Sequence, residues 1–313
     1  MIFISVIVPV YNNQCVIGRC LEAVRASIYQ NYELIVVDDA STDNTISLSS
    51  KYADTVIKLP LKRGRAYARN IGIESAKGEI IVNVDSDVII KTDTLTKIFD
   101  YFIYHPEIDA LTGCLSKEHP HASFFSQYKN LYMNYVFRRL PEKVTFLYGS
   151  ICALRRQSTQ LYYPNVDIGD DTAFGQRLVS IGKKIAFLKE LQVVHLKKYS
   201  LFSFFRNDFQ ISYHWAKIFL RYKGWKQLGR NKTGFAHASV GQLLSVMCAP
   251  AIVLCFSLFS PLPFASFFLF FLTLFLFLGW VVLNVGLIIF MGREKGILFA
   301  ILAFLLTFLD HIV

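Results

Sequence analysis

Charged residues are scarce in this chain, and its C-terminal quarter holds almost none. Asp, Glu, Lys and Arg make up 18% of the 313 residues and apolar residues make up 53%, whereas an average soluble domain has about 25% charged residues. From residue 233 onward, only Arg293, Glu294, Lys295 and Asp310 are charged. The apolar content excludes a disordered chain, and the uncharged C-terminal part disfavours a wholly soluble protein.

The sequence also shows no cysteine motif and, at its start, no pattern typical of a signal peptide. None of the six cysteines forms a CxxC pair or another metal-ligand spacing, which excludes a small disulfide scaffold. We expect reduced thiols, as in a cytosolic domain. Residues 1–4 lead directly into an apolar segment without a basic region or a cleavage site, so we expect no signal peptide.

Three long apolar runs occupy the C-terminal part, at 243–259, 264–290 and 296–313. A helix needs ~20 apolar residues to cross the hydrocarbon core of a bilayer, with a range of about 17–25. The sequence therefore predicts about three transmembrane helices within a membrane region at 237–313. The first and third runs are marginal in length, and a re-entrant or buried helix is the alternative for each.

Basic residues predict on which side of the membrane the rest of the chain lies. Residues 197–232 hold nine Lys and Arg and one acid, Asp208, directly before the first apolar run. Arg293 and Lys295 lie between the second and third runs. Because positive charge in short loops marks the cytoplasmic side, we expect an integral membrane protein whose first domain, residues 1–196, is cytoplasmic.

The segment 197–236 also carries many aromatic residues, among them Phe202, Phe209 and Trp225. Basic and aromatic residues occur together in nucleic-acid-binding proteins, but also in amphipathic helices that lie at a membrane surface. The segment adjoins a predicted span. We therefore expect it to lie on an anionic lipid surface, and we expect no nucleic-acid partner.

The first domain alternates short β-branched runs with helical patterns. Strands are predicted at 4–10, 33–37, 55–59, 80–84 and 110–115, and helices at 16–26, 45–52, 64–76 and 92–104. This alternation indicates an α/β fold, Rossmann-like, with a mainly parallel sheet. Ligands of such sheets bind beyond the carboxyl ends of the strands, so the polar residues that follow each strand are candidate site residues.

Two of these strand ends carry a pair of acids, Asp38 with Asp39 and Asp85 with Asp87. Neighbouring carboxylates repel each other unless a cation lies between them. Mg²⁺ typically binds one or two carboxylates together with phosphate oxygens, so Asp85 and Asp87 suit a metal that holds a diphosphate. The alternative is that these acids only cap the turn or helix that follows.

Four blocks of the sequence resemble the family 2 glycosyltransferases, in order and at the usual spacing. The first is Ser5-Val6-Ile7-Val8-Pro9-Val10-Tyr11-Asn12-Asn13, the second and third are at 31–43 and 64–79, and Asp85-Ser86-Asp87 resembles the DxD motif of the family. The resemblance covers the first ninety residues and is thinner as far as residue 196. It implies a GT-A fold, a nucleotide-sugar donor and a divalent metal, Mg²⁺ or Mn²⁺.

The resemblance also assigns residues to the nucleotide sugar. It implies that Asp39, with Asp38 beside it, contacts the nucleotide base, and that Pro9 and Tyr11 line the nucleotide pocket. Arg69 would contact the diphosphate or nucleotide, because a guanidinium pairs with phosphate through two hydrogen bonds. A solvated helix face is the alternative for Arg69.

The metal site follows from the same comparison. Asp85 would face the ribose and the metal, and Asp87 would bind the metal. His195 lies where many family members have a histidine after the last strand of the domain, and it could meet the metal or the diphosphate. A structural role is the alternative for a lone histidine.

A second group of residues resembles the acceptor side of the family's site. Asp170 and Asp171 match its ED motif at the start of a helix, with Asp170 in place of the usual Glu, so Asp171 is the expected catalytic base. Gly149 and Ser150 open a segment that resembles the small-residue strand beside the donor sugar. Helix capping is the alternative role for the two acids.

The resemblance implies an enzyme, and we expect a UDP-sugar as its donor and a hydroxyl of a lipid-linked glycan or glycolipid as its acceptor. The QxxRW motif of polymer-forming members is missing, since residues 210–215 lack its Arg and its spacing, so we expect transfer of a single sugar. A polyprenyl-phosphate acceptor, a nucleotidyltransferase and a non-catalytic membrane scaffold are the alternatives. Each of these alternatives has the same predicted organisation, an α/β domain followed by an interfacial segment and apolar helices.

Overall fold

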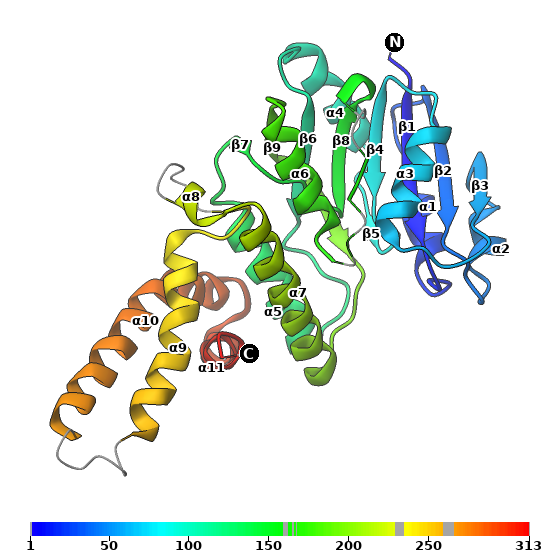
Figure 1. Cartoon of the computed structure of the whole chain (residues 1–313). Helices are drawn as coiled ribbons and strands as arrows, with labels where there is room; N and C mark the ends of the chain where they lie inside the picture. The colour runs from blue at the N-terminus through cyan, green and yellow to red at the C-terminus, as the bar shows by residue number, and fades with distance from the viewer. Residues whose placement is uncertain are drawn as a thin grey trace.

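The computed structural model describes residues 2–158, 162–164, 166, 168–228, 235–258 and 266–312. Three parts of the predicted segments lie outside the described residues. They are residues 229–234 of the interfacial segment, residue 259 at the end of the first predicted span, and residues 264–265 at the start of the second. The chain forms an α/β domain, followed by helices that extend away from it (Figure 1).

One sheet forms the centre of the domain, with strand order β3-β2-β1-β4-β8-β6-β9-β5 and with β7 also paired to β9. Its first half is wholly parallel, since β1 pairs with β2 and β4, and β2 pairs with β3. In the second half, β8 runs antiparallel to β4 and β6, and β6 is parallel to β9. The strands are β1 (Ile4–Val10), β2 (Tyr32–Asp38), β3 (Thr55–Lys58), β4 (Ile80–Val84), β5 (Val88–Ile89), β6 (Ala110–Leu115), β7 (Lys143–Val144), β8 (Ile151–Arg155) and β9 (Ile185–His195).

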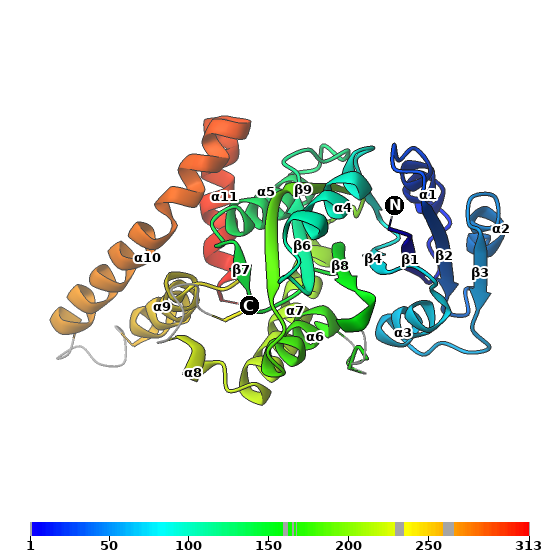
Figure 2. The same ribbon diagram turned by 90° about the horizontal axis from the view of Figure 1, so that it is seen from above.

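Helices cover both faces of this sheet (Figure 2). Alternate side chains of a strand point to opposite faces, so Val6 and Val8 of β1 pack with α1 and α4, whereas Ile7 packs with α3 and α6. The helices of the domain are α1 (Ile17–Arg25), α2 (Thr45–Ser49), α3 (Arg65–Ser75), α4 (Thr94–Tyr104), α5 (Phe124–Phe137) and α6 (Asp170–Ser180). The predicted α/β fold is confirmed.

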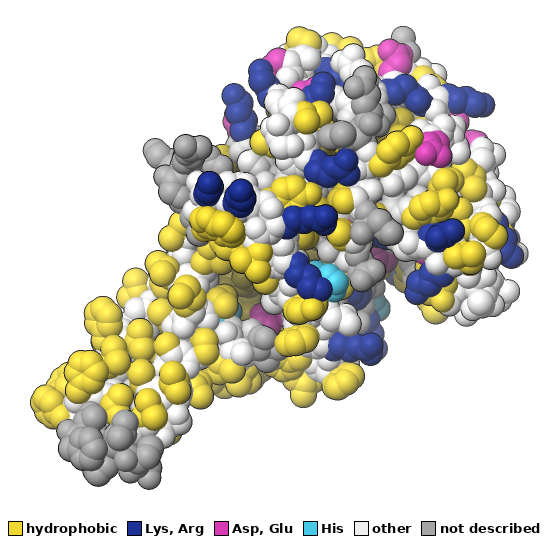
Figure 3. Space-filling view, in the orientation of Figure 1, with side chains coloured by type: hydrophobic (Ala, Val, Ile, Leu, Met, Phe, Trp, Pro, Cys, Tyr) yellow, Lys and Arg dark blue, Asp and Glu magenta, His cyan; other side chains and the backbone are white. Residues whose placement is uncertain are grey.

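In the part of the chain that the structure describes, five further helices follow the domain, namely α7 (Leu201–Arg221), α8 (Trp225–Leu228), α9 (Val240–Ser257), α10 (Ser266–Lys295) and α11 (Ile297–Asp310). Ser200 and Ser203 form a capping box that starts α7. Helices α9 and α10 lie side by side and extend away from the sheet (Figure 1). Their outer surface is almost entirely apolar (Figure 3). Both are long and apolar enough to cross a membrane.

The third apolar helix differs from our expectation of a third span. Helix α11 has 14 residues and is therefore about 21 Å long, which is less than the ~30 Å of a hydrocarbon core. The ring of Phe299, near the start of α11, lies 4.9 Å from that of Phe124, centroid to centroid, and Thr307 near its other end lies 2.9 Å from the hydroxyl of Tyr128. Because both ends contact the α/β domain, α11 lies along that domain, and among the described residues two helices are left as candidate spans.

Candidate active site

A cavity of about 1200 Å³ lies at the carboxyl ends of the parallel strands. Nine of the twelve site residues predicted from the sequence line it, and these are Pro9, Tyr11, Asp39, Asp85, Asp87, Gly149, Ser150, Asp171 and His195. They come from the ends of β1, β2, β4 and β9, from the turn before β8 and from the start of α6. Parallel strands bring their carboxyl ends to one edge of the sheet, which is why residues far apart in the sequence meet here.

The two acids after β2 have different environments. Asp38 is fully buried, and its carboxylate accepts a hydrogen bond of 2.9 Å from the backbone N–H of Ser41, which closes the turn. Asp39 lines the cavity, and its carboxylate accepts the backbone N–H groups of Arg63 and Gly64 at 2.7 and 2.8 Å. Of this pair, Asp39 is therefore the one that a ligand in the cavity can reach.

Arg69 is fully buried and joins the two groups of acids. Its Nη2 donates to Asp85 at 2.7 Å and to the carbonyl of Gly149 at 3.2 Å, and its Nη1 forms an ion pair with Asp170. Burial alone would lower the pKa of Arg69, but the charges of Asp170 and Asp85 hold that pKa well above its usual range. Arg69 thus fixes the end of β4 against the start of α6.

Asp170 belongs to the same buried cluster of charged side chains, Arg65, Arg69, Asp85 and Asp170, which we call the buried brace. Arg65 donates to one of its carboxylate oxygens through Nε at 3.2 Å and Nη2 at 2.6 Å, while Arg69 pairs with the other. Burial disfavours the ionised form, but the two arginines lower the pKa of Asp170 below its usual value. The side chains that we assigned to the diphosphate (Arg69) and to the acceptor side (Asp170) therefore contact each other, and neither lines the cavity.

Asp171 is the acid of this helix that faces the cavity. Its Oδ2 accepts the backbone N–H of Gly149 at 2.7 Å, and its Oδ1 accepts that of Thr172 at 2.7 Å. Burial and the negative charge of Asp170 raise the pKa of Asp171, against the opposite effect of Arg65 and Arg69. A carboxylate with a raised pKa takes up a proton more readily, as a general base must.

The predicted metal-binding residues form a pair. His195 Nε2 lies 3.4 Å from Asp87 Oδ2. Burial disfavours the charged carboxylate, but the hydrogen bond and charge of His195, together with Lys197, lower the pKa of Asp87. Among the described residues, no group of three or more His, Cys, Asp or Glu side chains is arranged to hold a metal. A carboxylate and an imidazole are groups that divalent ions bind, and phosphate oxygens and water would supply the further ligands.

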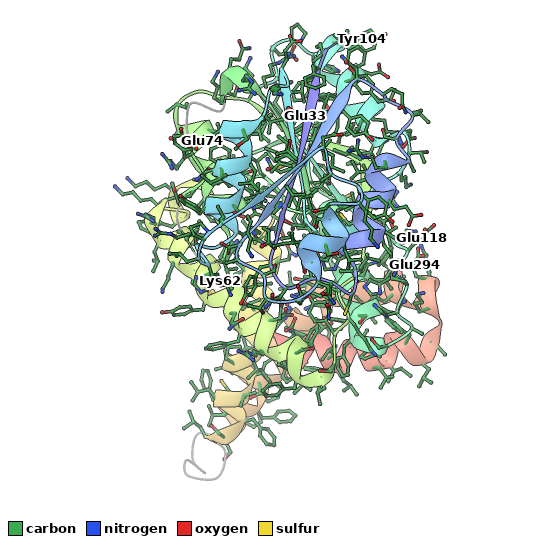
Figure 4. All side chains as sticks on the ribbon, turned by 90° about the vertical axis from the view of Figure 1, so that its right-hand side faces the viewer. Glu33, Lys62, Glu74, Tyr104, Glu118 and Glu294 are labelled. Carbon is green, nitrogen blue, oxygen red and sulfur yellow. The ribbon has the colours of Figure 1, made fainter. Side chains whose placement is uncertain are left out.

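Lys62 and Lys197, which the sequence analysis did not single out, also line the cavity. The ammonium group of Lys62 lies 3.8 Å from the ring centroid of Tyr11. Lys62 lies at the end of the sheet that is nearer to α7, and Glu33 lies toward the other end (Figure 4). Lys197 donates to Asn207 at 2.8 Å. Neither lysine belongs to a motif, and the one signal for Lys197 was its position two residues after His195.

The sheet, the acids at its carboxyl edge and the helix that begins at Asp170 define a GT-A-type α/β protein. The chain belongs to glycosyl transferase family 2, because the model of the family described as "Glycosyl transferase family 2" matches residues 5–162. The family assignment made from the sequence blocks is thereby confirmed.

Curated relatives match the first part of the chain. An "Uncharacterized glycosyltransferase" of Haemophilus influenzae is 40% identical over 108 residues, which are 33% of this chain and 43% of that protein. The glycosyltransferase GlyG of Streptococcus pneumoniae is 36% identical over 115 residues, which are 35% of this chain and 38% of that protein. The chain thus spans about two fifths of the length of these relatives.

Solved structures show the same fold. The mannosyltransferase PcManGT of Pyrobaculum calidifontis, in complex with GDP-Man and Mn²⁺, superposes with a TM-score of 0.56 at 19% identity, over 97% of this chain and 78% of that one. TarS 1–349 of S. aureus, in complex with UDP-GlcNAc, gives a TM-score of 0.50 at 23% identity, over 64% of this chain and 60% of that one. At these identities the likeness shows the fold alone.

Proposed function

We propose that this chain is a membrane-anchored, inverting glycosyltransferase that moves one sugar from a nucleotide-sugar donor to a hydroxyl group of a lipid-linked glycan or glycolipid. The observation that carries the proposal is the shared cavity, which is lined by the expected base-binding acid Asp39, the metal-binding pair Asp87 and His195, and the expected general base Asp171. Family membership supports the same reaction.

For the donor, we propose a UDP-sugar. TarS was solved with UDP-GlcNAc and PcManGT with GDP-Man, so nucleotide sugars suit this fold with either base. Pro9, Tyr11 and Asp39 lie together at one end of the cavity, where the nucleotide would bind. Gly149 and Ser150 line the part next to Asp171, where the sugar would lie.

For the metal, we propose Mn²⁺ or Mg²⁺ held by Asp87 and His195, with Asp85 beside them. PcManGT was solved with Mn²⁺. When bound, such an ion supplies charge neutralisation for the diphosphate that leaves. Arg69 holds one oxygen of Asp85 at 2.7 Å, so this carboxylate is already oriented before the donor binds.

The environment of Asp171 favours a hydroxyl acceptor over a phosphate. A hydroxyl must lose its proton as it attacks the anomeric carbon, whereas a phosphate monoester is already an anion and needs no base. Burial and Asp170 raise the pKa of Asp171, which suits proton transfer. The polyprenyl-phosphate acceptor is therefore the second candidate.

For the location, we propose that α9 and α10 anchor the chain in a membrane, with the α/β domain on the cytoplasmic side. Most of the exposed large side chains of the two helices are apolar, as the face in Figure 3 shows. Helix α7 exposes Phe202 and Phe209 beside basic residues, as an interfacial helix does. The proposal predicts that the full chain stays with membranes in high salt and is released by detergent. Release by salt alone would contradict the anchor.

The activity can be tested with the full chain in detergent or nanodiscs. Slow hydrolysis of each candidate nucleotide sugar should be measured with Mn²⁺, Mg²⁺ or EDTA, and then transfer to lipid acceptors. We expect one donor to be hydrolysed in a metal-dependent manner, and more slowly by Asp85→Asn. Glu74→Gln, on an exposed position of α3, is the matched control and should match the parent. No hydrolysis or binding of any nucleotide sugar would overturn the proposal.

A further inference from the structure

The cavity continues well beyond the strand ends. Its far end is lined by Leu243, Val246 and Pro250 of α9 and by Ile312 after α11. Its volume of about 1200 Å³ exceeds the roughly 300–1,000 Å³ of a typical small-molecule site. The cavity therefore has room for a second ligand beside the donor, and the walls of this additional part belong to apolar helices.

These walls connect the site to the apolar surface of the α9–α10 pair. On α9, Val246 is 45% exposed and lines the cavity, whereas its neighbour Met247 is 68% exposed and does not line it. On the face that Figure 3 shows, hydrophobic side chains cover most of both helices, and the charged residues Arg293 and Lys295 lie at the end of α10. One helix thus has an outer side that suits lipid and an inner side that forms the wall of the active-site cavity.

Between the strand ends and this apolar wall lies a buried polar group. Asp208 of α7 is 6% exposed, lines the cavity and pairs with Lys129 of α5 at 2.6 Å through Oδ1. Its other oxygen, Oδ2, has no hydrogen-bond donor among the residues that the structure describes. Burial raises the pKa of the adjacent Asp310 carboxyl to about 7, so near neutral pH this carboxyl supplies a proton to the oxygen in only part of the molecules. A buried carboxylate oxygen that lacks a donor is a strong acceptor for a ligand hydroxyl.

From these observations we infer that this half of the cavity binds a neutral glycolipid as the acceptor, a step that rests on the proposed function. The inner side of α9, at Leu243, Val246 and Pro250, takes the lipid chain. Asp208 accepts a hydrogen bond from a hydroxyl of the sugar that is attached directly to the lipid. The hydroxyl that is glycosylated then lies toward Asp171.

The charges of this region disfavour a lipid phosphate or diphosphate. Lys129 and Lys197 face the carboxyl groups of Asp87, Asp208 and Asp310. An additional phosphate would bring negative charge against buried acids, where the repulsion is poorly screened. A sugar hydroxyl brings no charge and supplies the missing donor.

The test compares two substitutions at adjacent positions of α9 in the full chain. Val246→Trp fills the inner side of the helix, and Met247→Trp places the same side chain on the outer side. Transfer should be measured to a monohexosyl diacylglycerol in vesicles and to a short-chain, water-soluble analogue of the same glycoside. We expect Val246→Trp to lower transfer to the long-chain acceptor at least tenfold and to affect the short analogue much less. Met247→Trp should resemble the parent with both acceptors.

A second variant tests the proposed hydrogen bond between Asp208 and the sugar of the glycolipid. Asp208→Asn should raise the KM for the glycolipid about tenfold, a loss typical of one hydrogen bond to a charged group. Polyprenyl phosphate and a polyprenyl-diphosphate-linked sugar serve as competing acceptors, and we expect the parent to prefer the neutral glycolipid. If Asp208→Asn does not fold, the comparison of Val246→Trp with Met247→Trp still decides.

Two results would overturn this inference. One is equal behaviour of the two tryptophan variants with the long-chain acceptor, and the other is preference of the parent for a phosphate-bearing acceptor. Both leave the proposed function intact as long as the parent hydrolyses a nucleotide sugar in the absence of acceptor. Loss of that hydrolysis would instead count against the proposed function.

Discussion

Asp171 lies directly against Gly149. The Oδ2 of Asp171 accepts the backbone N–H of Gly149 at 2.7 Å, and a Cβ atom at position 149 would come within 2.9 Å of that same oxygen. It would also come within 2.6 Å of Nη2 of Arg69. The absence of a side chain at residue 149 is therefore what allows the expected base and the buried arginine to meet beside the cavity.

This contact predicts the effect of Gly149→Ala. The added methyl group must displace Asp171 or Arg69, so we expect transfer to fall at least tenfold, and the free energy of unfolding to fall by about 1–3 kcal/mol, as for other overpacked sites. Gly18→Ala is the matched control, because a Cβ there meets nothing within 4 Å. Initial rates and melting temperatures of both variants check the prediction. A fully active Gly149→Ala protein would contradict the geometry.

The buried brace predicts a difference between the two arginines that share Asp170. Removing one partner of a buried ion pair typically costs about 3–5 kcal/mol, so Arg69→Met should destabilise the protein by that amount. The side chain of Arg65 is 40% exposed, and Asp170 would keep Arg69. We therefore expect Arg65→Met to cost about 1 kcal/mol or less, as for other exposed pairs. Thermal melting of the two variants side by side tests this order, and the reverse order would refute the brace.

The metal site predicts how the diphosphate is bound. Asp87→Asn should abolish transfer and weaken binding of the nucleoside diphosphate in Mn²⁺, while the affinity for the nucleoside alone is kept. Folding should survive, because the side chain of Asp87 is 30% exposed at the cavity. Calorimetric titration of parent and variant, with and without EDTA, is the measurement. If neither EDTA nor the substitution changes the affinity for the diphosphate, the proposal of a metal at this site is wrong.

The raised pKa of Asp171 also predicts a pH dependence of stability. Burial and Asp170 raise this pKa above the ordinary value of 3.8, so the folded state holds the proton more tightly than the unfolded state. Ionisation of Asp171 therefore lowers the free energy of unfolding as the pH rises from about 3.8 through the pKa of the folded state. The Asp171→Asn variant has no carboxyl group to ionise at this position, so its free energy of unfolding does not fall in this way. We expect the variant to melt no lower than the parent at neutral pH, and its advantage to shrink in acid. A variant that melts lower by the same amount at every pH would argue against the raised pKa.

Local patterns were enough to predict much of the α/β domain. The strands Ile4–Val10, Ile80–Val84 and Ala110–Leu115 were predicted residue for residue, because each is a short, buried, β-rich run between turn residues. Asp39, Asp85 and Asp171 were found through motifs, and all three line one cavity.

Long-range packing was not predictable in this way. Arg69 has the pattern of a solvated helix residue, and only the folded chain brings Asp170, 101 residues away, against it. The apolar run that forms α11 has the composition of a membrane span, but Thr307 contacts Tyr128, 179 residues earlier. Composition records how apolar a helix is, and not which surface covers it.

The most direct test of the central claim is the turnover of Asp171→Asn. Asparagine keeps the size of the side chain and one acceptor for the N–H of Gly149, but it cannot take up a proton. General-base assistance is worth typically about 10²–10⁴-fold in rate. The measurements are donor affinity, melting temperature and the initial rate with a hydroxyl-bearing lipid acceptor. We expect the variant to bind the donor as the parent does and to melt at or above the temperature of the parent. We expect its transfer rate to be at least a hundredfold lower. Turnover close to that of the parent would make Asp171 a structural residue and would favour the phosphate acceptor.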